Sequence, residues 1–151
     1  MHNYYTNEDL LVGVQSIARQ VVLDNYKPDI ILGVLRGGVI PAVYLSHWFK
    51  APMASVEWST RDGAVGCDLR DVISKVAQKK VLLVDDICDT GLTMQQLSTS
   101  LMMNGANNPI ELKSACLHHN LGQNVFEPDY YHLEINKLED PRWVVYPWEN
   151  L

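Results

Sequence analysis

Three carboxylates stand where a short apolar segment meets a glycine-containing turn. Val81–Val84 is apolar and partly β-branched, which is typical of a strand buried on both faces of a parallel sheet. Asp85, Asp86 and Asp89 follow the point where this strand is expected to stop, and Thr90–Thr93 then opens a segment that reads as a helix. A helix N-terminus offers free N–H groups to a phosphate. The carboxylates would repel such an anion, so they suit sugar hydroxyls, a bound Mg²⁺ or a developing positive charge.

A second glycine-containing loop occurs earlier in the chain. Ile30–Leu35 is an apolar run that predicts a buried strand, and it ends at Arg36-Gly37-Gly38. A helix is expected from Val39 to Phe49, because Pro41 near its first turn lacks an N–H that would have no partner there. Taken alone, a glycine pair indicates only a turn. Two units of strand, glycine loop and helix favour a shared site.

The remaining periodicities predict an α/β fold. A capping box at Thr6 and Asp9 starts a helix of apolar residues at helical spacing, which ends near Asn25. Strands alternating with helices imply a mainly parallel sheet covered on both faces, with ligands bound beyond the carboxyl ends of its strands. The other predicted elements are strands at Met53–Ser59, Glu111–His118, Asp129–Glu134 and Arg142–Tyr146, a mobile loop at Thr60–Arg70, and a helix at Leu92–Asn104 closed by Gly105.

Composition limits the classes of protein. The 151 residues suit a single domain, and 47% hydrophobic with 20% charged residues is ordinary globular material. A formal charge of −6 argues against a nucleic-acid-binding surface. The start of the chain does not resemble a signal peptide, and no apolar stretch is long enough for a membrane span. Three scattered cysteines, Cys67, Cys88 and Cys116, fit reduced thiols, so the cytoplasm is the expected compartment.

The whole segment from Val81 to Thr93, VLLVDDICDTGLT, resembles the phosphoribosyl pyrophosphate signature of the type I phosphoribosyltransferases. The end of the chain, Arg142–Glu149, resembles the ending of the short xanthine-guanine and hypoxanthine enzymes of bacteria and archaea. The resemblance implies a mainly parallel twisted sheet flanked by helices, with a small C-terminal hood. It divides the single domain, 1–151, into a core of about 1–120 and a base-binding hood of about 121–151.

The resemblance also implies roles for residues that bind the donor. Asp85 and Asp86 would hold the ribose hydroxyls, directly or through Mg²⁺. Asp89 would act as general base near N7 of a purine, although its simpler interpretation is a helix cap. The 5-phosphate would be bound by Asp89, Thr90, Gly91, Leu92 and Thr93, and the pyrophosphate by Leu35, Arg36, Gly37 and Gly38.

The acceptor base is predicted to bind near the C-terminus. By resemblance Trp143 would stack on the base, the backbone of Val144 would meet its edge, and Glu149 is a further base-binding candidate. The purine enzymes of the family usually carry a lysine at the end of the preceding strand, where this chain has His118. His118 could donate to a 6-oxo group or accept when neutral. It could hardly share a metal ion with His119, because neighbours on a strand point to opposite faces.

The resulting expectation is an Mg²⁺-dependent enzyme that transfers the 5-phosphoribosyl group from phosphoribosyl pyrophosphate to a 6-oxopurine. Transfer to adenine or a pyrimidine, and a non-catalytic regulator that senses phosphoribosyl pyrophosphate, remain alternatives. A general Rossmann-like binder would require a glycine fingerprint that this sequence lacks. The loop at Thr60–Arg70 corresponds in position to the family's active-site lid. A homo-oligomer, dimer or tetramer, is expected, without nucleic-acid or membrane partners.

Overall fold

Five parallel strands form the central sheet of the computed structural model, which describes residues 2–58, 69–104 and 107–151. Every residue of the strand Ile30–Val34 is buried, and the buried apolar residues Val81–Val84 fill much of the first half of the strand paired with it, Lys80–Cys88. Such continuous apolar runs are typical of strands covered on both faces. In sheet order the strands are β3 (Met53–Val56), β2 (Ile30–Val34), β4 (Lys80–Cys88), β5 (Glu111–Asn120) and β6 (Tyr130–Ile135).

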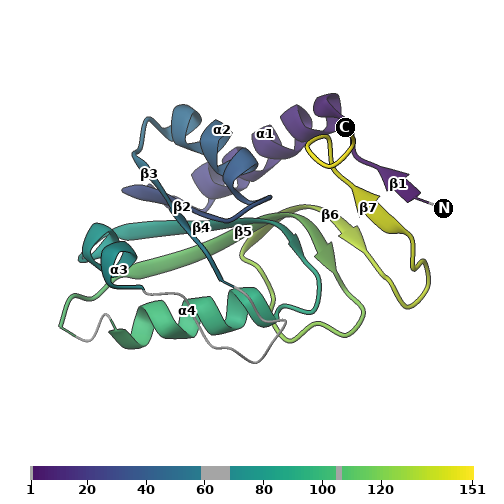
Figure 1. The fold of residues 1–151 in the computed structure, drawn as a ribbon. Helices are drawn as coiled ribbons and strands as arrows, with labels where there is room; N and C mark the ends of the chain where they lie inside the picture. The colour runs from purple at the N-terminus through teal and green to yellow at the C-terminus, as the bar shows by residue number, and fades with distance from the viewer. Residues whose placement is uncertain (1, 59–68, 105–106) are drawn as a thin grey trace.

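Helices cover both faces of this sheet (Figure 1). α1 (Asn7–Leu23) and α2 (Val39–Phe49) lie on one face, and α3 (Arg70–Val76) and α4 (Leu92–Asn104) lie on the other. Alternate residues of β4 enter the two cores: Leu82 packs in the core on the α1 side and Leu83 in the core on the α4 side. The predicted α/β fold with a parallel, helix-flanked sheet is confirmed.

The capping box predicted at Thr6 is present. Thr6 Oγ1 accepts from the Asp9 backbone N–H at 3.1 Å, and the Asp9 carboxylate accepts from the Thr6 N–H at 2.8 Å. These bonds satisfy N–H groups at the start of α1 that have no partner within the helix. They also hold the Asp9 carboxylate in its charged form, which lowers its pKa.

A separate two-stranded parallel sheet joins the two ends of the chain. β1 (His2–Tyr4) pairs with β7 (Trp143–Val145), and the Tyr5 N–H extends the pairing to Val145 O at 2.9 Å. The two strands lie together beyond one end of the main sheet (Figure 1). β6 lies in the central sheet, and the N-terminal strand lies in the small sheet with β7. The division into a core of about 1–120 and a hood of about 121–151 stays a prediction.

Two predictions differ from the structure. The strand expected to stop at Val84 continues to Cys88, so Asp85 and Asp86 lie within β4. β4 and β5 remain paired beyond the acids, at Ile87↔His118 and Cys88↔His119, which explains the longer strand. α3 was not predicted, although Leu69, Val72, Ile73 and Val76 have helical spacing. Most of the predicted Thr60–Arg70 loop, including Cys67, lies outside the described residues. The same is true of Gly105, which was predicted to close the helix at Leu92–Asn104.

No helix within residues 2–58, 69–104 and 107–151 is both long and apolar enough to cross a membrane.

Candidate active site

A cavity of about 880 Å³ opens at the carboxyl ends of β2 and β4. This is the edge at which parallel α/β sheets bind ligands. The cavity brings together the loop after β2, the end of β4, the start of α4 and the C-terminal segment of the chain. Its lining comprises Val34, Leu35, Arg36, Gly37, Ile40, Trp58, Asp85, Asp86, Ile87, Cys88, Asp89, Thr90, Gly91, Thr93, Met94, Trp143, Trp148 and Glu149.

The carboxylates of Asp85 and Asp86 form the floor of the cavity. Backbone N–H groups hold each of them: the Asp86 N–H donates to Asp85 Oδ1 and the Ile87 N–H donates to Asp86 Oδ1, both at 2.8 Å. Burial raises the pKa of Asp85, and the neighbouring Asp86 charge raises it further. Burial likewise raises the pKa of Asp86, with Glu149 adding to the effect. A cation or a sugar hydroxyl bound here would therefore stabilise the ionised form of these carboxylates.

The loop after β2 packs directly on these acids. A Cβ at Gly37 would collide with the Asp86 carboxylate, and a Cβ at Gly38 would lie 2.5 Å from Val84 O. Only glycine allows the backbone of this loop to lie so close to the Asp86 carboxylate and to the backbone of β4. The peptide bond between Leu35 and Arg36 is cis. The first of the two predicted glycine loops is thus in contact with the acidic end of β4 through Gly37 and Asp86.

The turn from β4 into α4 is held from below by Asn124. Its Nδ2 donates to Cys88 O at 3.1 Å and to Asp89 O at 2.9 Å, and its Oδ1 accepts from the Phe126 N–H at 2.6 Å. Gly91 has a φ of +83°, in the region that favours glycine. The turn presents the N-terminus of α4 to the cavity, with Thr90 and Thr93 in the lining. This arrangement suits a phosphate group.

Asp89 is held at both carboxylate oxygens. Asn120 Nδ2 donates to Oδ1 at 2.9 Å, and Lys137 Nζ donates to Oδ2 at 2.7 Å. Among the described residues, no N–H of α4 donates a hydrogen bond to the Asp89 carboxylate, so the simple interpretation as a helix cap is not supported. The Asp89 carboxylate instead faces the segment that follows β6.

Aromatic side chains form the opposite wall of the cavity. The Trp143 side chain is 54% exposed, and its Nε1 donates to Glu149 Oε2 at 3.5 Å. Trp148 stacks on Tyr146 with ring centroids 4.8 Å apart and an interplanar angle of 2°. An exposed indole over a cavity offers a planar surface on which a nucleobase could stack.

His118 lies beneath this wall and does not line the cavity. It is only 1% exposed, and its Nδ1 lies 2.8 Å from the Tyr146 hydroxyl. That hydroxyl donates to Asp86 O at 3.1 Å, so its single proton is already used and the Nδ1–H of His118 is the donor to Tyr146. Burial lowers the pKa of His118 to about 4, which keeps the ring neutral.

A family model described as "Phosphoribosyl transferase domain" matches residues 1–149. The chain belongs to this phosphoribosyl transferase domain family. Its fold resembles the crystal structure of a purine phosphoribosyltransferase from Pyrococcus horikoshii, with a TM-score of 0.77 and 28% identity over 99% of this chain and 95% of that one. The predicted recognition of the family is confirmed.

Curated relatives of the phosphoribosyl transferase domain carry other activities. A ribose-phosphate pyrophosphokinase from Corynebacterium ammoniagenes is 29% identical over 110 residues, which are 73% of this chain and 33% of that protein. An orotate phosphoribosyltransferase from Oceanobacillus iheyensis is 30% identical over 97 residues, which are 62% of this chain and 47% of that protein. The chain therefore spans between a third and a half of the length of these relatives.

The phosphoribosyl transferase domain brings most of the predicted site residues into one cavity. The exceptions are Gly38, Leu92, His118 and Val144. Gly38 packs behind the loop against β4, Leu92 is 39% exposed outside the cavity, and the Val144 side chain is buried in the core. His118 and His119 point to opposite faces of β5, as predicted: His118 contacts Tyr146 and His119 contacts Tyr131.

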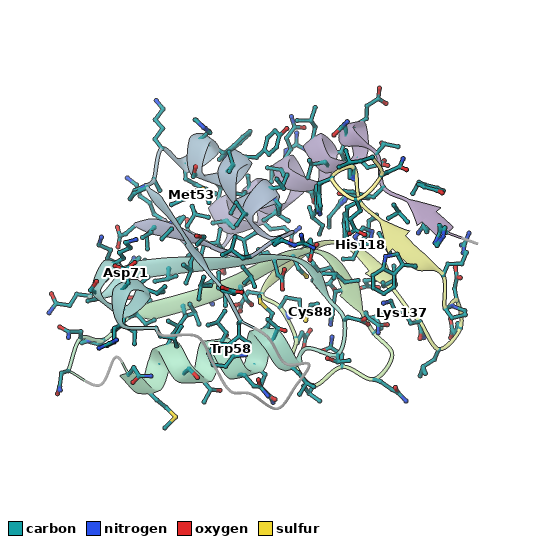
Figure 2. The ribbon with its side chains drawn as sticks, viewed as in Figure 1. Met53, Trp58, Asp71, Cys88, His118 and Lys137 are labelled. Atoms are coloured by element: carbon teal, nitrogen blue, oxygen red, sulfur yellow. The ribbon has the colours of Figure 1, made fainter. Side chains whose placement is uncertain are left out.

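Several residues of the site were not predicted from the sequence. Asn120 and Lys137 hold Asp89, Asn124 holds the turn before α4, and Trp58 lines the cavity. Figure 2 shows Trp58 beside α4, where its Nε1 donates to Gln96 Oε1 at 3.1 Å. Asn120 ends the strand that follows the acidic motif, so its position at the ligand-binding rim was a usable signal. Lys137 follows β6 with no local pattern to mark it.

Proposed function

We propose that this protein is an Mg²⁺-dependent phosphoribosyltransferase that transfers the 5-phosphoribosyl group from phosphoribosyl pyrophosphate to a 6-oxopurine, namely guanine, xanthine or hypoxanthine. The products are the nucleoside monophosphate and pyrophosphate, and the proposed compartment is the cytoplasm. One observation supports this proposal: a single cavity contains Asp85 and Asp86, the N-terminus of α4, the Arg36 loop and the exposed Trp143 ring. These groups suit, in turn, a ribose, a phosphate, a diphosphate and a planar base.

The donor side of the cavity suits a doubly phosphorylated sugar. The segment Asp89–Thr93 would bind the 5-phosphate through backbone N–H groups and threonine hydroxyls. Leu35 to Gly38 would bind the pyrophosphate, with the Arg36 guanidinium offsetting its charge. The contact of Gly37 with Asp86 holds the first of these loops against the end of β4.

The acids of β4 fit Mg²⁺ by the chemistry of their donor atoms. Carboxylate oxygens are ligands that Mg²⁺ prefers, and one or two carboxylates with substrate phosphates are its usual set. The described residues contain no cluster of three or more metal-binding side chains, so Asp85 and Asp86 would need the diphosphate and water as further ligands. When bound, Mg²⁺ would offset the charge of the departing pyrophosphate.

The proposed reaction forms a bond from N9 of the purine to C1 of the ribose and breaks the bond from C1 to pyrophosphate. Asp89 takes the N7 proton as the base attacks. The carboxylates of Asp85 and Asp86 stabilise the positive charge that develops on the ribose ring. Asn120 orients the carboxylate of Asp89 through its bond to Oδ1.

The acceptor would stack on Trp143, whose ring lines the cavity. Glu149 lies at the Nε1 edge of this ring and is a proposed contact for the edge of the base. The proposed contact through the Val144 backbone stays a prediction, as does the homo-oligomer. His118 acts in this proposal through Tyr146, with no contact to the base.

Two alternatives have specific support. The similarity to an orotate phosphoribosyltransferase favours a pyrimidine as a second candidate acceptor. The cavity would also suit a regulator that binds phosphoribosyl pyrophosphate without turnover. The acidic net charge of −6 disfavours nucleic acid as the target of such a regulator.

One assay separates these functions. Radiolabelled phosphoribosyl pyrophosphate is incubated with Mg²⁺ and, separately, with guanine, xanthine, hypoxanthine, adenine, orotate and uracil. Nucleotide formation with the 6-oxopurines is expected. If nucleotide forms only with adenine, orotate or uracil, that base is the acceptor instead of a 6-oxopurine. If phosphoribosyl pyrophosphate is not consumed with any base, the regulator is favoured.

A further inference from the structure

Lys137 lies at the junction between Asp89 and the aromatic wall. It follows β6, and its backbone N–H donates to Asn120 Oδ1 at 3.1 Å, which fixes it to the end of β5. Its Nζ lies 2.7 Å from Asp89 Oδ2 and 5.0 Å from the centroid of the Trp143 ring. His118 and Lys137 both lie toward the same end of the sheet in Figure 2, and the Lys137 side chain contacts two residues that line the cavity, Asp89 and Trp143.

Asn120 makes this arrangement more rigid than a surface ion pair. Its Nδ2 donates to Asp89 Oδ1, while its Oδ1 accepts from the N–H groups of Lys137 and Gly122. Asn120 itself is 4% exposed. One buried amide therefore holds both the carboxylate and the backbone that carries the ammonium. Exposed pairs contribute little to stability, whereas this pair is oriented and the Lys137 side chain is 21% exposed.

The ammonium of Lys137 retains donors for a ligand. It carries three N–H donors and no acceptor, and one of them is used by Asp89. Asp89 and Trp143 both line the cavity, so a planar base on Trp143 would bring one edge to the pair formed by Lys137 and Asp89. That edge would meet a donor and an acceptor side by side.

A 6-oxopurine presents the matching groups. O6 lies beside N7 on the same edge of the ring, whereas adenine presents an amino donor in place of O6. If Asp89 takes the N7 proton, O6 faces the ammonium, and an adenine amino group would face it donor to donor. We infer that Lys137 binds the 6-oxo group and is the residue that selects oxopurines over aminopurines. This inference rests on the proposed function.

The inference replaces His118 in the role for which it was predicted. The His118 ring is 1% exposed and donates to Tyr146. A base in the cavity cannot reach it without displacing the aromatic wall. Lys137 supplies from another part of the chain the donor that the end of β5 lacks.

The test compares Lys137→Met, which keeps the apolar stem, with Lys137→Arg, which keeps donors and charge. Lys75→Met is the matched control, because Lys75 lies on α3 and pairs with Asp71. Hypoxanthine and adenine are assayed with saturating phosphoribosyl pyrophosphate and Mg²⁺, and their binding is measured by calorimetry. In Lys137→Met, kcat/KM for hypoxanthine should fall about 10- to 100-fold, as expected for loss of a charged hydrogen bond. The value of kcat/KM for adenine should not fall. Lys137→Arg should recover part of the loss.

The ratio of kcat/KM for hypoxanthine to kcat/KM for adenine distinguishes a role of Lys137 in selecting the base from a role in supporting Asp89. An equal fall for hypoxanthine and adenine in Lys137→Met would overturn the inference and leave Lys137 as a support for Asp89. An unchanged ratio with unchanged rates would overturn it as well. If the wild-type protein turns over no base, the proposed function fails, and the calorimetric preference for hypoxanthine then decides the inference. Loss of that preference in Lys137→Met supports it; retention, or no binding of either base, overturns it.

Discussion

The donor side and the acceptor side of the cavity are built in different ways. The side proposed for the donor consists of the end of β4 and of two loops that follow neighbouring strands, β2 and β4. The acceptor side gathers single side chains from the segment after β6, from β7 and from the C-terminal turn. The first is encoded in short continuous segments, and the second exists only after the chain has folded.

The two sides meet at two points. Asp89 belongs to the donor loop and is held by Asn120 and Lys137. Tyr146 belongs to the C-terminal segment and donates to Asp86 O. If the sides act as separate binding surfaces, variants on each should affect different kinetic constants. The predictions below test that separation.

Asp86→Asn is expected to have the largest effect. In the proposed mechanism this change removes a charge that would stabilise the ribose in the transition state and would offer an oxygen to Mg²⁺, while Oδ1 of the new side chain can still accept from the Ile87 N–H. We expect kcat to fall about 10²- to 10³-fold, by analogy with loss of one electrostatic group from an active site. Steady-state kinetics measures this, with Asp71→Asn on α3 as an exposed control. An Asp86→Asn enzyme with wild-type kcat would remove the acids from the mechanism.

Trp143→Ala should affect the acceptor side alone. Loss of the stacking surface should raise KM for the base about tenfold, because stacking of a base on an aromatic ring is worth about 1–3 kcal/mol. KM for phosphoribosyl pyrophosphate should change less than twofold. Trp48→Ala is the control, since Trp48 is a half-exposed indole on α2 and lies outside the cavity lining. A parallel rise in both KM values would show that the two sides are not separate.

The separation also explains what the sequence could predict. The acids, the glycine loops and the helix after β4 form local patterns, and parallel topology places them on one rim. The β1–β7 pairing could not be predicted from two three-residue strands at opposite ends of the chain. Lys137 lies 48 residues from Asp89 with no motif around it.

His118 lies outside the cavity lining for a physical reason. Strand alternation predicts that His118 and His119 face opposite sides, and this is confirmed. Alternation does not tell what covers each side. Tyr5, from the N-terminal segment, and Tyr146, from the C-terminal segment, pack on His118 with centroids 4.8 and 5.5 Å away and exclude it from the cavity. Only the tertiary contacts of the chain ends determine that outcome.

The last expected effect is on stability rather than on activity: it concerns how stably the C-terminal segment is held, and it depends on pH. His118 has a pKa of about 4 when folded against an ordinary value of 6.5, so unfolding takes up a proton between these values. The contribution of neutral His118 to the free energy of unfolding is complete above pH 6.5. It is lost as the pH falls toward 4, and the loss is at most about 3 kcal/mol. Asp9, Tyr5 and His132 are the other titratable groups nearby, and burial also lowers the pKa of His132.

His118→Gln isolates this contribution. Glutamine can still donate to the Tyr146 hydroxyl but does not titrate, so the loss of unfolding free energy between pH 6.5 and 4 should be smaller than in the wild type. Urea unfolding at several pH values measures it, with His47→Gln on α2 as an exposed control. If the free energy of unfolding changes with pH by the same amount in wild type and in His118→Gln, the histidine takes up its proton in the folded state too. The segment that carries Trp143 would then be held more loosely than the buried His118–Tyr146 contact indicates.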